Sequence, residues 1–104
     1  MPKGYERYCI SVKHYFKDVT DSNYKRVISV HNNLDDAIAK LVDLSVKINP
    51  FCKFTEDFVK TEIEEEPEML DKGYSYRIVF ERLIDAEMFY EGPGAYVLSK
   101  TLLQ

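Results

Sequence analysis

Hydrophobic residues recur at helical spacing between residues 33 and 49, in the stretch NLDDAIAKLVDLSVKIN. Leu34, Ile38 and Leu41 begin a stripe that continues to Ile48 at intervals of three or four residues. Such intervals return to the same face of an α-helix at each step. The charged residues of the stretch fall outside this stripe, so the pattern predicts an amphipathic helix.

Both ends of the stretch carry signals that delimit a helix. Asn33 can cap the first turn, because its side-chain oxygen can accept from an unpaired backbone N–H. Asp35 and Asp36 follow it, where the helix dipole favours negative charge. Pro50 disfavours helical geometry at the preceding residue. We therefore predict one helix over residues 33–48, about 24 Å long at 1.5 Å per residue.

Alternating apolar and polar residues precede the helix in two segments. Residues 5–16 alternate well enough for a strand, and residues 24–31 form a second strand with Ile28 and Val30 pointing inward. The turn-forming residues 18–23 lie between them. This arrangement predicts a β-hairpin that leads directly into the helix.

The second half of the chain contains two further strand patterns. Residues 74–84 alternate most regularly, and we predict that they form a central strand. Residues 85–91 suit a turn or two of helix, and the Gly-Pro-Gly sequence at 92–94 predicts a sharp break. Residues 95–103 then form the last predicted strand.

Residues 51–66 fit two structures. Val59 and Ile63 share one face of an edge strand, whereas Thr55 would equally cap a short helix. The sequence does not decide between strand and helix over residues 54–64. We favour the strand, because Thr, Val, Phe and Ile are strand-prone, and we expect a loop over residues 67–73.

The predicted order of elements is β-β-α-β-β-(short α)-β. This order places the chain in the α+β class, with a four- to five-stranded, mostly antiparallel sheet and one long helix on one face. A length of 104 residues suits a single globular domain over residues 1–104. An uncovered sheet face or edge strand could be closed by a second copy, so the sequence leaves a homodimer open.

Charge is distributed unevenly along the chain. Residues 1–53 contain nine Lys or Arg and six Asp or Glu, a net charge of +3, whereas residues 54–104 contain five and twelve, a net charge of −7. Lys outnumbers Arg ten to four, a bias that suits an AT-rich genome such as those of many bacteria and phages. The acidic excess lies between residues 56 and 71.

The sequence contains no recognisable catalytic or cofactor motif. Cys9, Cys52, His14 and His31 are the candidate metal ligands, but they do not form a CxxC, HxxxH or HExxH pattern. Ser11 with His14, or Cys9 with His31, would need an orienting acid to act as a nucleophile. No glycine-rich phosphate loop occurs. We therefore expect no enzyme activity, no cofactor, no metal and no Cys9–Cys52 disulfide.

The leading hypothesis is a small cytoplasmic interaction protein. It would bind and modulate a protein partner with a basic site, through an acidic strip and a tyrosine-rich surface. A phage or mobile-element inhibitor of a host system would suit this size and composition. No run of residues is long and apolar enough to predict a membrane span. The candidate partner-binding residues are Glu62, Glu64, Glu65, Glu66, Glu68, Tyr74, Tyr76, Tyr90 and Tyr96.

Two other functions compete with this hypothesis. One is a small-ligand or nucleotide-binding module that uses a cleft between helix and sheet. The other is nucleic-acid binding by the first hairpin, where Lys13, Lys17, Lys25 and Arg26 are interleaved with aromatic residues. The acidity of the second half counts against nucleic acid, because phosphates would be repelled.

Overall fold

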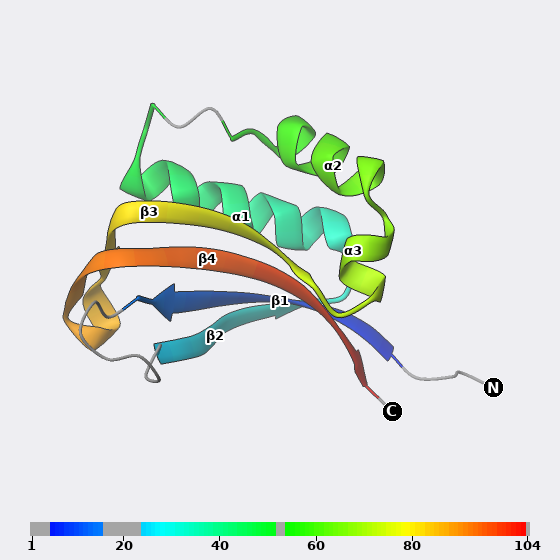
Figure 1. The fold of residues 1–104 in the computed structure, drawn as a ribbon, viewed down its shortest axis with the longest axis horizontal. Coiled ribbons are helices and arrows are strands. Elements are labelled where there is room, and N and C mark those ends of the chain that lie inside the picture. The colour runs from blue at the N-terminus through cyan, green and yellow to red at the C-terminus, as the bar shows by residue number, and fades with distance from the viewer. Residues whose placement is uncertain (1–4, 16–23, 52–53, 104) are drawn as a thin grey trace.

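The computed structural model describes residues 5–15, 24–51 and 54–103. It shows an α+β fold in which helices pack against a four-stranded antiparallel sheet (Figure 1). The class and the long helix agree with the sequence prediction, and the order of elements agrees in outline. The elements are β1 (Tyr5–His14), β2 (Tyr24–His31), α1 (Leu34–Ile48), α2 (Glu56–Glu65), α3 (Glu68–Asp71), β3 (Ser75–Asp85), the 3-10 turn η1 (Ala86–Met88) and β4 (Tyr90–Leu103).

The strands lie in the order β2-β1-β4-β3, and every neighbouring pair is antiparallel. β1 and β2 form the predicted hairpin. β1 also pairs with β4 along its whole length, from Tyr5 opposite Leu103 to His14 opposite Gly94. The first and last strands of the chain therefore form the centre of the sheet.

The long helix α1 has the predicted cap and buried face. The Asn33 side-chain oxygen accepts from the backbone N–H of Asp36 at 2.9 Å. Ala37, Ile38 and Leu41 are buried against the sheet. Burial of one large aliphatic side chain contributes about 1.5–3 kcal/mol, so this stripe fixes the helix on its face of the sheet.

The core lies between the sheet and the helices. Ile10 and Val12 of β1, Ile78 of β3 and Leu98 of β4 pack in the same cluster as Leu41. Side chains from α2 and α3 join this cluster, so the described helices share one side of the sheet. None of the described helices is both long enough and apolar enough to cross a membrane.

The strand prediction for residues 54–64 is wrong, because this segment forms the helix α2. The Thr55 hydroxyl accepts from the backbone N–H of Phe58 at 3.1 Å, as the alternative interpretation required. Val59 and Ile63 lie one helical turn apart and are both buried. Their packing beside α1 outweighs the modest strand propensity of the segment. The predicted loop at residues 67–73 contains the short helix α3.

The predicted positions of the last two strands also need correction. β3 lies at the edge of the sheet, and β4 takes the central position. The Gly-Pro-Gly sequence lies inside β4 and does not break it. A Cβ atom on Gly94 would lie 2.6 Å from the Lys13 carbonyl oxygen, so the close approach of β1 requires glycine. Pro93 lies opposite the register shift between Phe80 and Leu83, where the regular ladder is interrupted.

Candidate functional site

An open pocket of about 700 Å³ lies where α2, α3 and the start of β3 meet. We call it the acidic pocket. Three of the five glutamates predicted to bind a partner line it, together with the exposed Tyr74. The lining residues are Glu65, Glu66, Pro67, Glu68, Met69, Lys72, Tyr74 and Ser75.

Two tight turns form the walls of this pocket. α2 ends at Glu65, and the backbone N–H of its C-cap, Glu66, donates to the Ile63 carbonyl at 3.2 Å. After α3, Gly73 has a φ of +88°, a left-handed conformation that glycine adopts without a steric penalty. The Tyr74 N–H then donates to the Met69 carbonyl at 2.9 Å. These turns bring Tyr74 to the same opening as the glutamates.

The charge at the end of α2 is poorly compensated. Glu64 and Glu65 lie in the last turn of α2, which contains no basic residue, and Glu66 caps it. The C-terminal end of a helix carries partial negative charge, so acidic residues there are unfavourable. Within the described ranges, none of the three carboxylates forms an ion pair. A cation bound at this point would relieve the repulsion.

The third acid that lines the pocket has a local partner. Glu68 lies 2.9 Å from the Lys72 ammonium, one helical turn away, and both side chains are exposed. Exposed pairs of this kind contribute at most about 1 kcal/mol. A stronger cationic ligand could therefore take the place of Lys72 at little cost.

Glu62 and Tyr76 lie together beside the pocket. The Tyr76 hydroxyl donates a hydrogen bond to the Glu62 carboxylate and joins α2 to β3. Burial, and then the hydrogen bond and charge of Glu62, raise the pKa of Tyr76 above its usual value of 10.0. The phenol therefore stays protonated at neutral pH and acts as a donor.

The other two tyrosines of the sequence prediction do not reach this surface. Tyr96 lies in the core, where its ring meets Phe80 edge to face at 5.8 Å. Burial raises the pKa of Tyr96. Tyr90 stacks on His14 with ring centroids 3.8 Å apart. Neither tyrosine is available to a partner at the acidic pocket.

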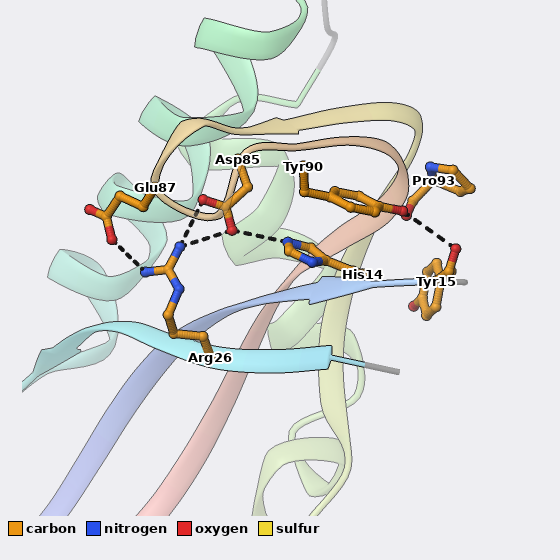
Figure 2. A network of polar contacts seen from close by, with 7 residues as sticks. All are labelled: His14, Tyr15, Arg26, Asp85, Glu87, Tyr90 and Pro93. Carbon is orange, nitrogen blue, oxygen red and sulfur yellow. Dashed lines mark hydrogen bonds and ion pairs between the residues drawn. The ribbon is translucent and has the colours of Figure 1, made fainter. Parts of the chain in front are cut away.

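A second polar cluster, which the sequence analysis did not anticipate, closes the far end of the sheet (Figure 2). We call it the buried ion cluster; it comprises the buried His14 and Asp85, the half-buried Arg26 and, at its rim, the exposed Glu87. Asp85 accepts from His14 Nε2 at 2.9 Å and from the Arg26 guanidinium at 2.8 and 2.9 Å. Arg26 also donates to Glu87 at 3.1 Å. The tip of the β3–β4 hairpin is thereby fastened to β1 and β2.

The charge of Asp85 is stabilised from both sides. Burial alone would raise the pKa of Asp85, but hydrogen bonds from Arg26 and His14 outweigh it and lower the pKa below 3.8. Of the helix predicted over residues 85–91, only the short turn η1 forms, and the Asp85 side chain makes no capping bond to it. Alternation along β1 puts His14 on the helix side, whereas Asp85 reaches that side only because the register shift between Phe80 and Leu83 reverses the alternation of β3. The pairing of β1 with β4 then brings the two residues together.

The arrangement does not assemble the nucleophilic pairs considered from the sequence. Ser11 and His14 point to opposite faces of β1, because they lie three positions apart along the strand. Cys9 contacts Thr101 at 3.8 Å, whereas His31 Nε2 contacts Ser29 Oγ at 2.8 Å. Over the described ranges, no three His, Cys, Asp or Glu side chains are placed to hold a metal ion. Cys52 lies outside these ranges, as does any bond between it and Cys9.

A smaller pocket of about 210 Å³ lies between α1, the α2–α3 segment and the sheet, where Leu34, Ile63 and Tyr8 meet Lys100. Its volume is below the roughly 300–1,000 Å³ of typical small-molecule sites. A larger, open recess of about 510 Å³ lies between the end of α1, at Ile48 and Asn49, and β3. The described residues therefore form recesses between helix and sheet.

No protein-family model, curated protein or solved structure matches this chain.

Proposed function

We propose that this chain is a small, non-catalytic interaction protein that binds a basic segment of a protein partner at the acidic pocket. The observation that carries the proposal is the convergence of uncompensated glutamates and Tyr74 on one opening. Glu65 and Glu66 supply negative charge, and Tyr74, with 66% of its surface exposed, supplies an aromatic face. A lysine or arginine of the partner would meet both features at once.

The chemistry of the pocket suits an arginine or lysine side chain. Met69 and Pro67 offer apolar surface to the aliphatic stem of such a side chain. The charged end would lie among the carboxylates, and it could also stack on Tyr74, an interaction worth about 0.5–1 kcal/mol at an exposed site. The surrounding acids would speed association with a basic partner through long-range attraction.

Binding of this kind would allow the protein to modulate its partner. A basic segment of the partner that normally binds a nucleic acid or another polyanion would bind the acidic pocket instead. The polyanion would then be excluded. We propose this inhibitory role, in the cytoplasm and in a phage or mobile-element setting, as an extension of the binding proposal. The composition of the chain and the local acidic surface support it.

The proposal can be tested with the double variant Glu65→Lys/Glu66→Lys. We expect the wild-type protein to bind fluorescent arginine-rich peptides in an anisotropy titration, and the variant to bind at least about tenfold more weakly. The matched control is Asp43→Lys/Glu91→Lys, which reverses two exposed acids away from the pocket. Equal loss of affinity in both double variants would reduce the interaction to non-specific attraction and would contradict the proposal.

The volume of the acidic pocket also favours a second candidate, a small cationic ligand. About 700 Å³ lies within the range of small-molecule sites. Thermal unfolding can be followed with spermidine, free arginine and adenosine monophosphate as probes. A rise of several degrees with a cation alone would favour the small-ligand function, because ligands that bind the native state raise its stability. The carboxylates are expected to exclude the nucleotide.

A further inference from the structure

The sheet has a second face, which we call the open face. No described helix packs on it, because α1, α2 and α3 all contribute to the core on the other side. Small side chains occupy its centre, where Ser11, Ala95 and Val97 are buried. Cross-strand register and alternation assign these residues to one face.

Exposed aliphatic side chains lie on both sides of this central row. Val27 and Val30 of β2 are each 54% exposed, and Val79 of β3 is 63% exposed. Val27 pairs with Ser11, and Val79 pairs with Ala95, so the valines flank the small residues across the sheet. Exposed valines around small central residues are suited to packing against an apolar stripe.

The charges of the open face are predominantly positive. Lys13 and Lys25 lie directly opposite each other on β1 and β2. Like charges at directly paired positions destabilise a sheet, yet within the described residues neither lysine has a carboxylate at ion-pair distance. Arg77 is exposed on β3, whereas Glu81 lies farther along the same strand. An anionic partner would relieve the repulsion between the two lysines.

The helix layer has the opposite charge. Residues 34–72 contain eleven Asp or Glu and five Lys or Arg. Arg26, predicted to join the basic surface of the first hairpin, lies on the helix side and binds Asp85 and Glu87. The helix layer is therefore acidic, opposite in sign to the open face.

The charges and side chains of this face discriminate among possible occupants. A second copy stacked face to face would bring two predominantly positive surfaces together, which is repulsive. Single-stranded nucleic acid binds largely through aromatic stacking. Tyr15, at the end of β1, is the one aromatic side chain that the structure describes on this face, and it already lies 5.6 Å from Lys13 Nζ. The exposed valines and the neighbouring cations of this face instead complement a partner that carries an apolar stripe bordered by acidic residues.

We infer that the open face is a docking surface for an amphipathic, acidic helix of a protein partner. The apolar stripe of that helix would pack on the exposed Val27, Val30 and Val79, which flank the buried central row, about 10 Å above the sheet. Its flanking carboxylates would meet the Lys13–Lys25 pair on one side and Arg77 on the other. This surface is separate from the acidic pocket, so the inference does not depend on the function proposed for that pocket.

The inference can be tested with three synthetic helical peptides of about 18 residues. The first has a leucine stripe flanked by glutamates, the second has the same stripe flanked by lysines, and the third has the glutamates with the leucines replaced by serine. Binding is followed by backbone amide NMR of the full chain. We expect the first peptide to bind at least about tenfold more tightly than the others and to shift the amides of β2 and β3 around Val27 and Val79.

Two variants locate the binding site. Lys13→Glu/Lys25→Glu is expected to weaken binding of the first peptide by about tenfold or more. Glu65→Lys/Glu66→Lys, in the acidic pocket, is expected to leave it unchanged. Thermal unfolding of both variants checks that they are folded. If Lys13→Glu/Lys25→Glu does not fold, Val27→Ser/Val79→Ser is used in its place. We expect the same loss of affinity for the first peptide.

Four results would overturn the inference. The first is equal binding of the three peptides, and the second is the absence of shifts on the open face at about 150 mM salt. Tighter binding of an oligothymidylate than of the first peptide would assign the face to single-stranded nucleic acid. A concentration-dependent dimer that protects the same amides would assign it to a second copy. If the arginine-rich peptides did not bind the acidic pocket, the proposed function would be contradicted, but the inference about the open face would not be affected.

Discussion

The buried ion cluster and the acidic pocket are both rich in charge, but their charges have different partners. In the buried ion cluster, Asp85 accepts hydrogen bonds from His14 and Arg26, and its charge is satisfied within the chain. In the acidic pocket, Glu65 and Glu66 lie at the unfavourable end of a helix dipole without an ion-pair partner among the described residues. Charge that is paired internally stabilises the fold, whereas unpaired charge at a surface is available for binding.

The largest effect is expected from removal of the central acid of the buried ion cluster. Asp85→Ala leaves His14 and Arg26 without their shared acceptor, and breaking a buried ionic contact typically costs about 3–5 kcal/mol. The free energy of unfolding, measured by urea denaturation, should fall by that amount. Asp43→Ala, which removes an exposed i,i+4 pair with Lys47, should cost less than about 0.5 kcal/mol. Similar losses in the two variants would remove the contrast between buried and exposed charge.

Acid pH offers a second way to disrupt the buried ion cluster. The pKa of Asp85 is lower in the folded state than its ordinary value of 3.8. The stability that its charge contributes is therefore fully present above the ordinary pKa, and it is lost as the pH falls through the lower folded value. We expect the melting temperature of the wild type to fall more steeply than that of Asp85→Asn below about pH 4. If the melting temperatures of the two proteins fell in parallel with pH, the charge of Asp85 would not contribute to stability in this range.

The Tyr76–Glu62 hydrogen bond is intermediate between the two regions, because it joins elements of the fold at the edge of the pocket. Tyr76→Phe removes the hydroxyl and keeps the ring, and we expect a loss of about 1 kcal/mol in the free energy of unfolding. Glu62→Gln serves as the control, since it retains an acceptor without the charge. Peptide binding at the acidic pocket should change little in Tyr76→Phe. A large loss of binding would extend the site to this pair.

The smallest change in stability is expected at the acidic pocket, and it is a gain where the preceding variants show losses. Glu65→Lys/Glu66→Lys places positive charge at the C-terminal end of α2, where each favourable charge contributes about 0.3–1 kcal/mol. The variant should therefore unfold at the same or slightly higher urea concentration while losing affinity for arginine-rich peptides. A clear loss of stability would show that these glutamates serve the fold rather than binding.

Local signals in the sequence were sufficient for α1 and for the first hairpin. The period of Leu34, Ile38 and Leu41, the Asn33 cap and Pro50 all act within a few residues, so they keep their meaning in any tertiary context. The acidic strip was also visible, because a run of glutamates beside a proline is bound to stay near solvent. The structure adds that this run meets Tyr74 at a common opening.

Tertiary structure alone decided the rest. Residues 56–65 carry both a strand-like alternation and a helical cap, and the burial of Val59 and Ile63 beside α1 selected the helix. The central position of β4 depends on its pairing with β1, from the opposite end of the chain. The buried ion cluster depends on the same pairing. Contacts of such long range leave no periodic mark on a sequence, because each partner looks locally like an ordinary strand residue.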